Sequence, residues 1–370
     1  MKQFFVRPDI HAFKTCAEFA EEFNIGEGDL IFTNEYILHP CFDHYINGAD
    51  VLFQEKYGKG EPSDQMVEAI MQDIQKPYKR IIAIGGGTVI DIAKLLVLKK
   101  VLPLVDLFDQ KVKPEKVSEL VIVPTTCGTG SEVTNLSILA LISRNTKMGF
   151  GSEEMFADHA VLIPELLRSL PFYVFATSSI DALIHAVESS VSPKATAYSN
   201  LFAYRAIEMI LTGYQQLLRE GREILPEMME TFLMASNYAG IAFSNAGCGA
   251  VHALSYPIGG AYHVPHGEAN YEVFTGVFKK YMQLKQDGAL DTLNQTLARI
   301  LDCKEGEVYE ALETLLNNLI PKKPLREYGI TQEELKEFAG SVMRSQTRLL
   351  NQSFTQLTEA DVLDIYESLY

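Results

Sequence analysis

The sequence predicts an α/β domain followed by an all-helical domain, with the boundary between residues 176 and 177. In residues 1–176, short apolar runs alternate with helical periodicity, as in the βαβ units of a parallel sheet. In residues 177–370, long helical periodicities follow one another with almost no strand-like run. A length of 370 residues also favours two domains over one.

The first domain opens with apolar runs of strand length. Asp29–Thr33 (DLIFT) and Val51–Gln54 predict buried strands, and Ser63–Gln75 predicts an amphipathic helix before the next strand. This order suits a parallel sheet, because parallel strands need long crossover connections.

A glycine-rich turn follows the next apolar run. GGGT (Gly85 to Thr88) separates the predicted strand Ile81–Ile84 from the predicted helix Val89–Leu98. Glycines let the backbone approach a ligand, and the free N–H groups of a helix start favour an anion such as a pyrophosphate. The turn lacks the GxGxxG fingerprint, and glycines also form plain tight corners, so both interpretations stay open on this turn alone.

A second turn, PTTCGTGSE (Pro124 to Glu132), follows the predicted strand Leu120–Val123. Its hydroxyl side chains, including those of Thr125 and Thr126, can donate and accept hydrogen bonds. Ligands of open parallel sheets bind beyond the carboxyl ends of the strands, where both turns would lie. Two such turns in one sheet favour a Rossmann-like nucleotide-binding domain over plain polar loops.

The second domain is predicted from helical periodicity. Thr358, followed by two acidic residues within one turn, predicts the start of its last helix. The predicted helices include Ala197–Leu218, Glu227–Phe243, Leu290–Leu301, Val308–Leu319 and Glu359–Leu369.

Four side chains of the second domain form a candidate metal centre. Asp181 and His185 lie four residues apart in a helical stretch, so both leave the same helix face. His252 and His266 stand in a later glycine-rich segment. One carboxylate and three imidazoles suit Zn²⁺ or Fe²⁺ better than Mg²⁺ or Ca²⁺. The first pair alone would more often be a capping or pairing contact, and the second segment favours the metal.

Charge and composition narrow the class of protein. There are 32 basic and 48 acidic residues, and the net charge of −16 disfavours nucleic acid and anionic membranes as partners. The five cysteines are scattered without a CxxC pair, which is typical of reduced thiols in a cytosolic protein. Neither a signal peptide nor a stretch of about 20 apolar residues is evident, so we expect a cytoplasmic protein without a membrane partner.

The motifs together resemble a known family, the iron-containing (group III) alcohol dehydrogenases. They are GGGTVIDIAK, PTTCGTGSE, SSIDALIHAVES and NAGCGAVHALSYPIGGAYHVPHG, and they occur in the family's order over most of the chain. The resemblance implies a fold similar to dehydroquinate synthase, a small alcohol or aldehyde substrate, NAD, one divalent ion and a homodimer or higher homo-oligomer. The chain is most similar to members that interconvert 4-hydroxybutyrate and succinate semialdehyde.

The resemblance also implies roles for single residues. The metal ligands would be Asp181, His185, His252 and His266. The cofactor would be contacted by two glycines and several polar residues, namely Gly86, Gly87, Thr88, Asp91, Thr125, Thr126 and Lys147.

Four positions depart from the family pattern. Thr88 and Val89 replace the usual serine and proline of the first turn. Tyr256 stands where many members have a proton-relay histidine; a tyrosine is a poorer base, and the nearby His263 could replace it or be structural. Asn34 follows the strand DLIFT where many members that prefer NAD have aspartate, so NAD is expected and NADP stays possible.

Three alternative functions remain at this point. A related dehydrogenase could act on an uncharged primary alcohol or diol. A lyase similar to dehydroquinate synthase would also use NAD and a metal, but the segments around Asp181 and His252 lack the basic residues that a phosphorylated substrate requires. A non-catalytic metal-binding module is disfavoured by the two nucleotide turns.

Overall fold

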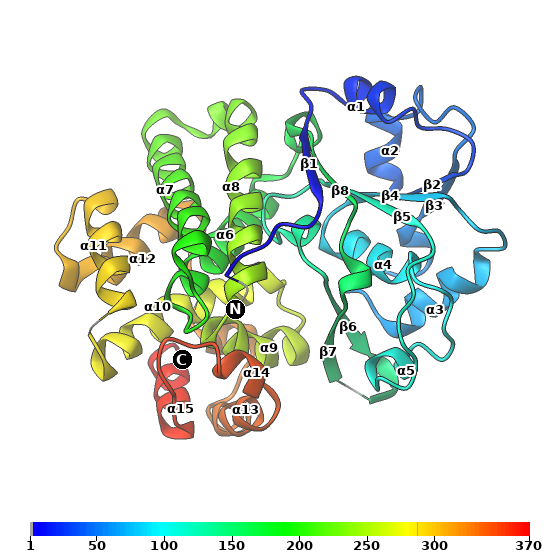
Figure 1. The fold of residues 1–370 in the computed structure, drawn as a ribbon. Coiled ribbons are helices and arrows are strands. Elements are labelled where there is room, and N and C mark those ends of the chain that lie inside the picture. Colours follow the sequence, from blue (N-terminus) through cyan, green and yellow to red (C-terminus); the bar gives the residue numbers. More distant parts are fainter. Residues whose placement is uncertain (1–2, 145, 287) are drawn as a thin grey trace. The chain divides into compact units, whose positions relative to one another are not determined.

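The computed structural model describes residues 3–144, 146–286 and 288–370. The chain divides into two compact units, one of which spans Val6–Leu170. The other spans Pro171–Tyr370 and includes the described residues before Val6 (Figure 1). The second unit thus begins six residues before the predicted 177 (177 − 171 = 6), because its first helix already starts at Phe172.

The start of the chain belongs to the helical unit, in contrast to the predicted first domain. The amide N–H of Phe5 donates to Asn245 Oδ1 at 2.9 Å, and Asn245 Nδ2 donates back to the Phe5 carbonyl at 2.9 Å. The ring of Phe4 stacks on that of Phe202. These contacts involve residues distant in sequence, which local patterns do not reveal.

A six-stranded parallel sheet forms the centre of the α/β unit, with the order β1-β8-β5-β4-β2-β3. The predicted strands are present with bounds shifted by at most one residue. The six strands are β1 (Asp9–Ala12), β2 (Asp29–Thr33), β3 (Asp50–Phe53), β4 (Arg80–Gly85), β5 (Glu119–Pro124) and β8 (His159–Leu162).

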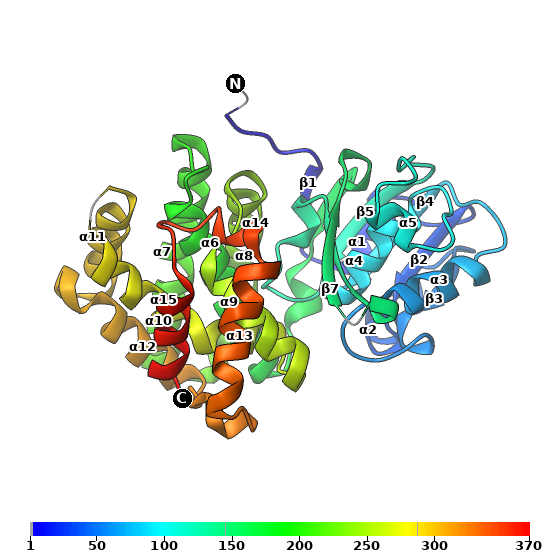
Figure 2. The same ribbon diagram turned by 90° about the horizontal axis from the view of Figure 1, so that it is seen from below.

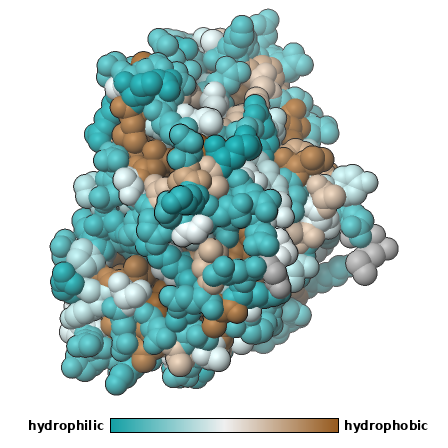
Figure 3. All heavy atoms as spheres, turned by 90° about the vertical axis from the view of Figure 1, so that its left-hand side faces the viewer, coloured by the Kyte–Doolittle hydropathy of each residue, from teal (hydrophilic) through white to brown (hydrophobic). Residues whose placement is uncertain are grey.

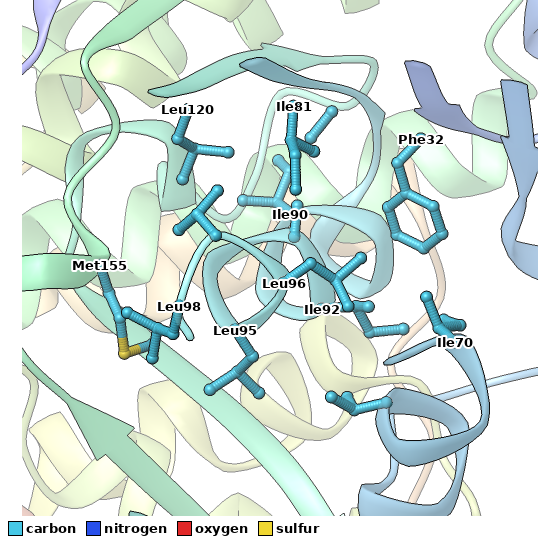
Figure 4. Close-up of a cluster of buried hydrophobic side chains, with 14 of the residues drawn as sticks. Phe32, Ile70, Ile81, Ile90, Ile92, Leu95, Leu96, Leu98, Leu120 and Met155 are labelled. Carbon is cyan, nitrogen blue, oxygen red and sulfur yellow. The ribbon is translucent and has the colours of Figure 1, made fainter. Parts of the chain in front are cut away.

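Helix α4 (Gly87–Leu96) packs against β4 and β5 (Figures 1 and 2), and most of its residues from Val89 onward are buried. Figure 4 shows the core around it, where Ile90 lies near Ile81 and Leu120 of the sheet. The helix begins and ends two residues earlier than predicted (89 − 87 = 2; 98 − 96 = 2), so Gly87 and Thr88 form its first turn. The unit also contains α1 (Cys16–Glu22), α2 (Glu35–Cys41), α3 (Asp64–Asp73) and α5 (Val105–Phe108).

An antiparallel hairpin, β6 (Leu136–Leu141) and β7 (Thr146–Gly151), was not predicted. Buried and half-buried residues alternate along β6, as expected for a strand with one covered face. Strands β1 and β8, of four residues each, were also missed, and β1 is exposed along most of its length, so it lacks the apolar run of a buried strand.

The helical unit is built around α6 (Phe172–Val191), against which α7 (Ala197–Glu220), α8 (Leu225–Ala246) and α10 (His266–Leu284) pack. Because neighbours surround α6, nearly every residue from Phe175 onward is buried. The remaining helices are α9 (Ala250–Tyr262), α11 (Ala289–Leu301), α12 (Val308–Leu319), α13 (Gln332–Ser345), α14 (Thr347–Leu350) and α15 (Glu359–Ser368). Thr358 caps α15, as its sequence predicts.

Hydrophobic side chains on the face drawn in Figure 3 form separate patches within a mostly hydrophilic surface. Among the described residues, no helix combines the length and the apolar character that crossing a bilayer requires.

Candidate functional site

The four predicted metal ligands converge in the helical unit. Asp181 and His185 occupy one face of α6, His252 lies in the first turn of α9, and His266 is the first residue of α10. Oδ1 of Asp181 lies 3.8 Å from Nε2 of His252 and 4.0 Å from Nε2 of His266. Its other oxygen lies 4.0 Å from Nδ1 of His185. Three histidines thus surround one carboxylate.

The spacing of these atoms fits a divalent metal ion. Ligand atoms of a tetrahedral Zn²⁺ site with bonds of about 2.1 Å lie roughly 3.4 Å apart, so a small contraction would complete the coordination. Nε2 of His252 is buried and forms no hydrogen bond with the described residues. A buried nitrogen without a partner is costly unless a ligand binds it. The donor set suits Fe²⁺ or Zn²⁺.

The charge of the Asp181 carboxylate is maintained by its neighbours. Burial alone would raise its pKa, but the imidazoles of His185, His266 and His252 and the Asn270 amide lower the pKa below the ordinary value. The carboxylate is therefore ionised, as a metal ligand must be.

Glu188, which the sequence analysis did not select, orients His252. Nδ1 of His252 lies 2.6 Å from Oε2 of Glu188, and the amide N–H of Val251 donates to Oε1 at 2.6 Å. A carboxylate accepts, so the imidazole proton resides on Nδ1 and the lone pair of Nε2 is directed towards Asp181. Glu188 continues the Asp181–His185 face by one turn, and this spacing was the available signal in the sequence.

Two further residues contact the ligands. Nδ2 of Asn270 donates to Oδ1 of Asp181 at 2.7 Å and lies 3.2 Å from Nε2 of His266. The Cys248 thiol is buried, and its sulfur lies within 4.8 Å of ring nitrogens of His185 and His252. Sequence reasoning had classed this cysteine only as a reduced thiol.

The approach of α10 to α6 depends on Gly267. A Cβ atom at this position would lie 2.3 Å from the carbonyl oxygen of Thr177, closer than real Cβ contacts allow. A glycine is therefore required directly after His266 for this ligand to reach Asp181. The His266 side chain is 32% exposed, whereas that of Asp181 is 4% exposed, so the site is accessible beside His266.

The two candidate proton-relay residues differ in position. The ring centroid of Tyr256 lies 6.2 Å from that of His266, and burial raises the pKa of Tyr256 above its ordinary value. Its hydroxyl therefore remains protonated at neutral pH. His263 is exposed and ends α9 in the left-handed conformation with a φ of 54°, which indicates a structural role in the turn.

The two predicted nucleotide turns meet at the carboxyl ends of β4 and β5 in the α/β unit. The N–H of Thr125 donates to the Gly85 carbonyl at 3.1 Å. A Cβ atom on Gly86 would lie 3.5 Å from Cγ2 of Thr126, so the two turns lie close together. Gly86 precedes α4 without a capping side chain, which leaves the first N–H groups of this helix available to an anion.

Other predicted cofactor residues already have protein partners. The carboxylate of Asp91 accepts from Ser131 Oγ at 2.9 Å and from the Ile138 N–H at 3.0 Å. Both its oxygens are thus used within the unit, which favours a structural role for Asp91. Lys147 forms an ion pair with Glu61 at 2.7 Å, and the Thr88 hydroxyl donates to the Gly60 carbonyl at 3.2 Å.

A carboxylate lies beside Asn34 although Asn34 itself is uncharged. Nδ2 of Asn34 donates to Oε2 of Glu55 at 2.8 Å and to Oε1 of Gln54 at 3.3 Å. Oε1 of Glu55 also accepts from the Glu35 N–H at 2.7 Å. Because β2 pairs with β4 on one side and with β3 on the other, Asn34 lies one strand away from the glycine turn, and Glu55 follows the strand beyond it. Glu55 is 21 positions from Asn34 along the chain, so local sequence patterns do not reveal this contact.

Comparison with known proteins supports this description of the two units. Residues 11–164 match the family model described as iron-containing alcohol dehydrogenase, and residues 175–370 match the C-terminal model of the same family. The chain is 52% identical over 371 residues to 4-hydroxybutyrate dehydrogenase from Clostridium kluyveri, with 100% of both chains covered. It is 33% identical to long-chain-alcohol dehydrogenase 1 from Geobacillus thermodenitrificans, covering 79% of this chain and 75% of that protein.

Solved structures share the fold. Sulfoacetaldehyde reductase from Bifidobacterium kashiwanohense, in complex with NAD⁺, has a TM-score of 0.84 at 21% identity and covers 100% of this chain and 98% of that one. A crystal structure of an iron-containing alcohol dehydrogenase has a TM-score of 0.81 at 25% identity, covering 100% and 99%. With family models matching both units and a relative similar over its whole length, the chain belongs to the iron-containing alcohol dehydrogenase family.

Proposed function

We propose that this enzyme interconverts 4-hydroxybutyrate and succinate semialdehyde with NAD and one divalent ion, Fe²⁺ or Zn²⁺. The observation that carries the proposal is the cluster of Asp181 and three histidines with the unpartnered Nε2 of His252. The substrate follows from the relative that is 52% identical over the full length. The family assignment favours this dehydrogenase over the lyase and the non-catalytic alternative.

Different residues of the chain would bind the metal ion, bind the cofactor and transfer the proton. A divalent ion held by Asp181, His185, His252 and His266 would supply Lewis acidity at the substrate oxygen. The N–H groups at the start of α4 would bind the pyrophosphate of NAD. The nicotinamide of NAD would accept the hydride from the carbinol carbon. The hydroxyl proton leaves to water, and the protonated Tyr256 hydroxyl would relay it through a hydrogen bond.

A hydroxy acid also requires a cation for its carboxylate. We propose Arg348, an exposed residue of α14, because α14 packs on α9 and the Arg348 charge acts on Tyr256. Arg348→Gln should raise the KM for succinate semialdehyde about tenfold and leave the KM for butyraldehyde unchanged, since about 1.4 kcal/mol of ion pairing would be lost. Arg344→Gln, on the neighbouring helix, is the matched control.

The decisive assay is NADH oxidation by the metal-reconstituted enzyme with succinate semialdehyde or butyraldehyde at equal concentration. We expect preference for the semialdehyde and loss of activity in His266→Ala, whereas His44→Ala, at an exposed histidine, should retain activity. Equal or better use of butyraldehyde would instead favour the uncharged alcohol. A lack of activity with both aldehydes, whether NADH or NADPH is supplied, would contradict the proposal. Cytoplasmic location remains a prediction from the sequence, and a homodimer or higher homo-oligomer remains a prediction from the family resemblance, with gel filtration as the test of the latter.

A further inference from the structure

A second group of side chains of the types that can ligate a metal lies in the α/β unit, at the amino ends of three neighbouring strands. It consists of Asp9 and His11 on β1, His159 on β8 and Glu119 on β5, and is called the edge cluster below. The register pairs Asp9 with His159, and His159 with Val121, which lies two residues after Glu119. Residues paired in register, and residues two apart on one strand, share a face of the sheet. All four side chains therefore leave the same face.

The two imidazoles of the edge cluster are in direct contact. Nε2 of His11 lies 3.0 Å from Nδ1 of His159. The other nitrogen of His159, Nε2, lies 3.4 Å from a carboxylate oxygen of Glu119. Since a carboxylate accepts, Glu119 favours the proton on Nε2 and leaves the lone pair of Nδ1 facing His11. The same carboxylate–imidazole arrangement orients His252 at the active site.

A third ligand and an aromatic support complete the arrangement. A carboxylate oxygen of Asp9 lies within 4.8 Å of ring nitrogens of both histidines. The ring of Phe23 packs edge-on against both imidazoles, with centroids 5.1 Å from His11 and 5.3 Å from His159. Arg80, which pairs with Glu119 in the register, is held by Asp29 at 2.6 Å and 3.0 Å. That guanidinium charge is thus compensated outside the edge cluster.

We propose that the edge cluster is a second divalent metal site, for Zn²⁺ or a similar imidazole-binding ion, with His11, His159 and Asp9 as ligands. Imidazole and carboxylate are common ligands of this ion, and adjacent ligands in a tetrahedral site lie roughly 3.4 Å apart. The 3.0 Å between the two nitrogens requires only a small opening to admit the ion. Water can occupy the remaining position because the site is half-exposed.

The edge cluster is separate from the proposed nucleotide site of the same unit. It lies at the amino ends of β1, β8 and β5, whereas the glycine and threonine turns follow the carboxyl ends of β4 and β5. A metal ion here would link β1, a four-residue edge strand, to β8. Its role would therefore be to stabilise the beginning of the α/β unit rather than to take part in hydride transfer.

The test is a count of bound zinc. The metal-stripped full-length enzyme is dialysed against Zn²⁺, and bound metal is measured by mass spectrometry. We expect two equivalents per chain for the wild type and for His44→Gln, and one for His11→Gln and for His159→Gln. Glu119→Gln should keep the second equivalent with about tenfold weaker affinity, because it removes only the orientation of His159.

Two results would overturn the proposal. One is a wild type that binds a single equivalent; the other is a His11→Gln variant that binds as much zinc as the wild type. Anomalous diffraction from wild-type crystals soaked in Zn²⁺ does not depend on the folding of any variant. A peak between His11 and His159 supports the site, and a peak at the active site alone contradicts it.

Discussion

His252 and Glu188 form a hydrogen bond of 2.6 Å between the imidazole of a proposed metal ligand and a carboxylate on the neighbouring helix. The two residues are 64 positions apart, and both side chains are buried. The contact determines which nitrogen of His252 faces Asp181. Glu188 is therefore a positioning residue for the metal centre, although it is not one of the four predicted ligands.

Substituting Glu188 should weaken metal binding without removing a ligand. We expect Glu188→Gln to lower the affinity for Zn²⁺ or Fe²⁺ by about 10–100-fold, as for other partners of metal-bound histidines. Competition with a coloured chelator measures this affinity independently of activity. Glu227→Gln, at an exposed carboxylate in the first turn of α8, serves as the control. An unchanged metal affinity in Glu188→Gln would remove Glu188 from this role.

Gly267 should tolerate no side chain. In Gly267→Ala the new methyl group would meet the Thr177 carbonyl at 2.3 Å, so α10 must shift and carry His266 away from Asp181. We expect a loss of about 1–3 kcal/mol in the free energy of unfolding, together with weaker metal binding. Chemical denaturation and metal titration measure the two effects. Gly260→Ala is the matched control, because nothing lies within 4 Å of a Cβ atom there; equal behaviour of the two variants would contradict the close-approach argument.

Glu55 should determine the preference for NAD over NADP, given the proposed cofactor. Its carboxylate bonds to Asn34 beside the glycine turn and would repel the 2′-phosphate of NADP. Glu55→Gln retains the shape and removes the charge, so we expect the ratio of kcat/KM for NADPH to that for NADH to rise about tenfold, or about 1.4 kcal/mol. Steady-state kinetics with both cofactors provide the measurement. The exposed Glu27→Gln should leave the ratio unchanged, and an unaffected ratio in Glu55→Gln would contradict the prediction.

Glu272 should make the stability depend on pH. Burial raises the pKa of Glu272 from 4.5 to about 7, despite the hydrogen bond from the Tyr328 hydroxyl and the charge of Lys322. Its Oε2 is buried without a hydrogen-bond partner among the described residues. Because the folded pKa is raised, the protonated carboxyl stabilises the fold fully below pH 4.5, and this contribution is lost as the pH rises through 7.

The free energy of unfolding of Glu272→Gln minus that of the wild type should therefore increase between pH 4.5 and pH 8, by up to about 3 kcal/mol. Denaturant unfolding at several pH values tests this. The exposed Glu310→Gln should show no such pH-dependent difference. If the difference in free energy of unfolding between the wild type and Glu272→Gln is the same at pH 5 and pH 8, the predicted role of Glu272 is contradicted.

Much of the fold was predictable because its signals are local. The strand DLIFT coincides with β2, and helical periodicity located most of the helical unit, since apolar residues at fixed spacing need one buried face. Among the strands that were missed, β1 and β8 are held by pairing with each other across 150 positions of sequence (159 − 9 = 150), which no local pattern reveals. The strands β6 and β7 pair with each other in a hairpin.

The candidate site also combines residues that local sequence patterns predict with contacts that only the tertiary structure reveals. Asp181 and His185 on one helix turn, and glycines after an apolar run, are patterns within single elements, so the sequence alone was enough to propose the metal ligands and the nucleotide turns. The partner of His252, the carboxylate beside Asn34 and the contact of His11 with His159 were decided by tertiary packing. These contacts join side chains that are 64, 21 and 148 positions apart. Hydrogen bonds of this kind form only once the sheet register and helix packing are complete, so local periodicity does not predict them.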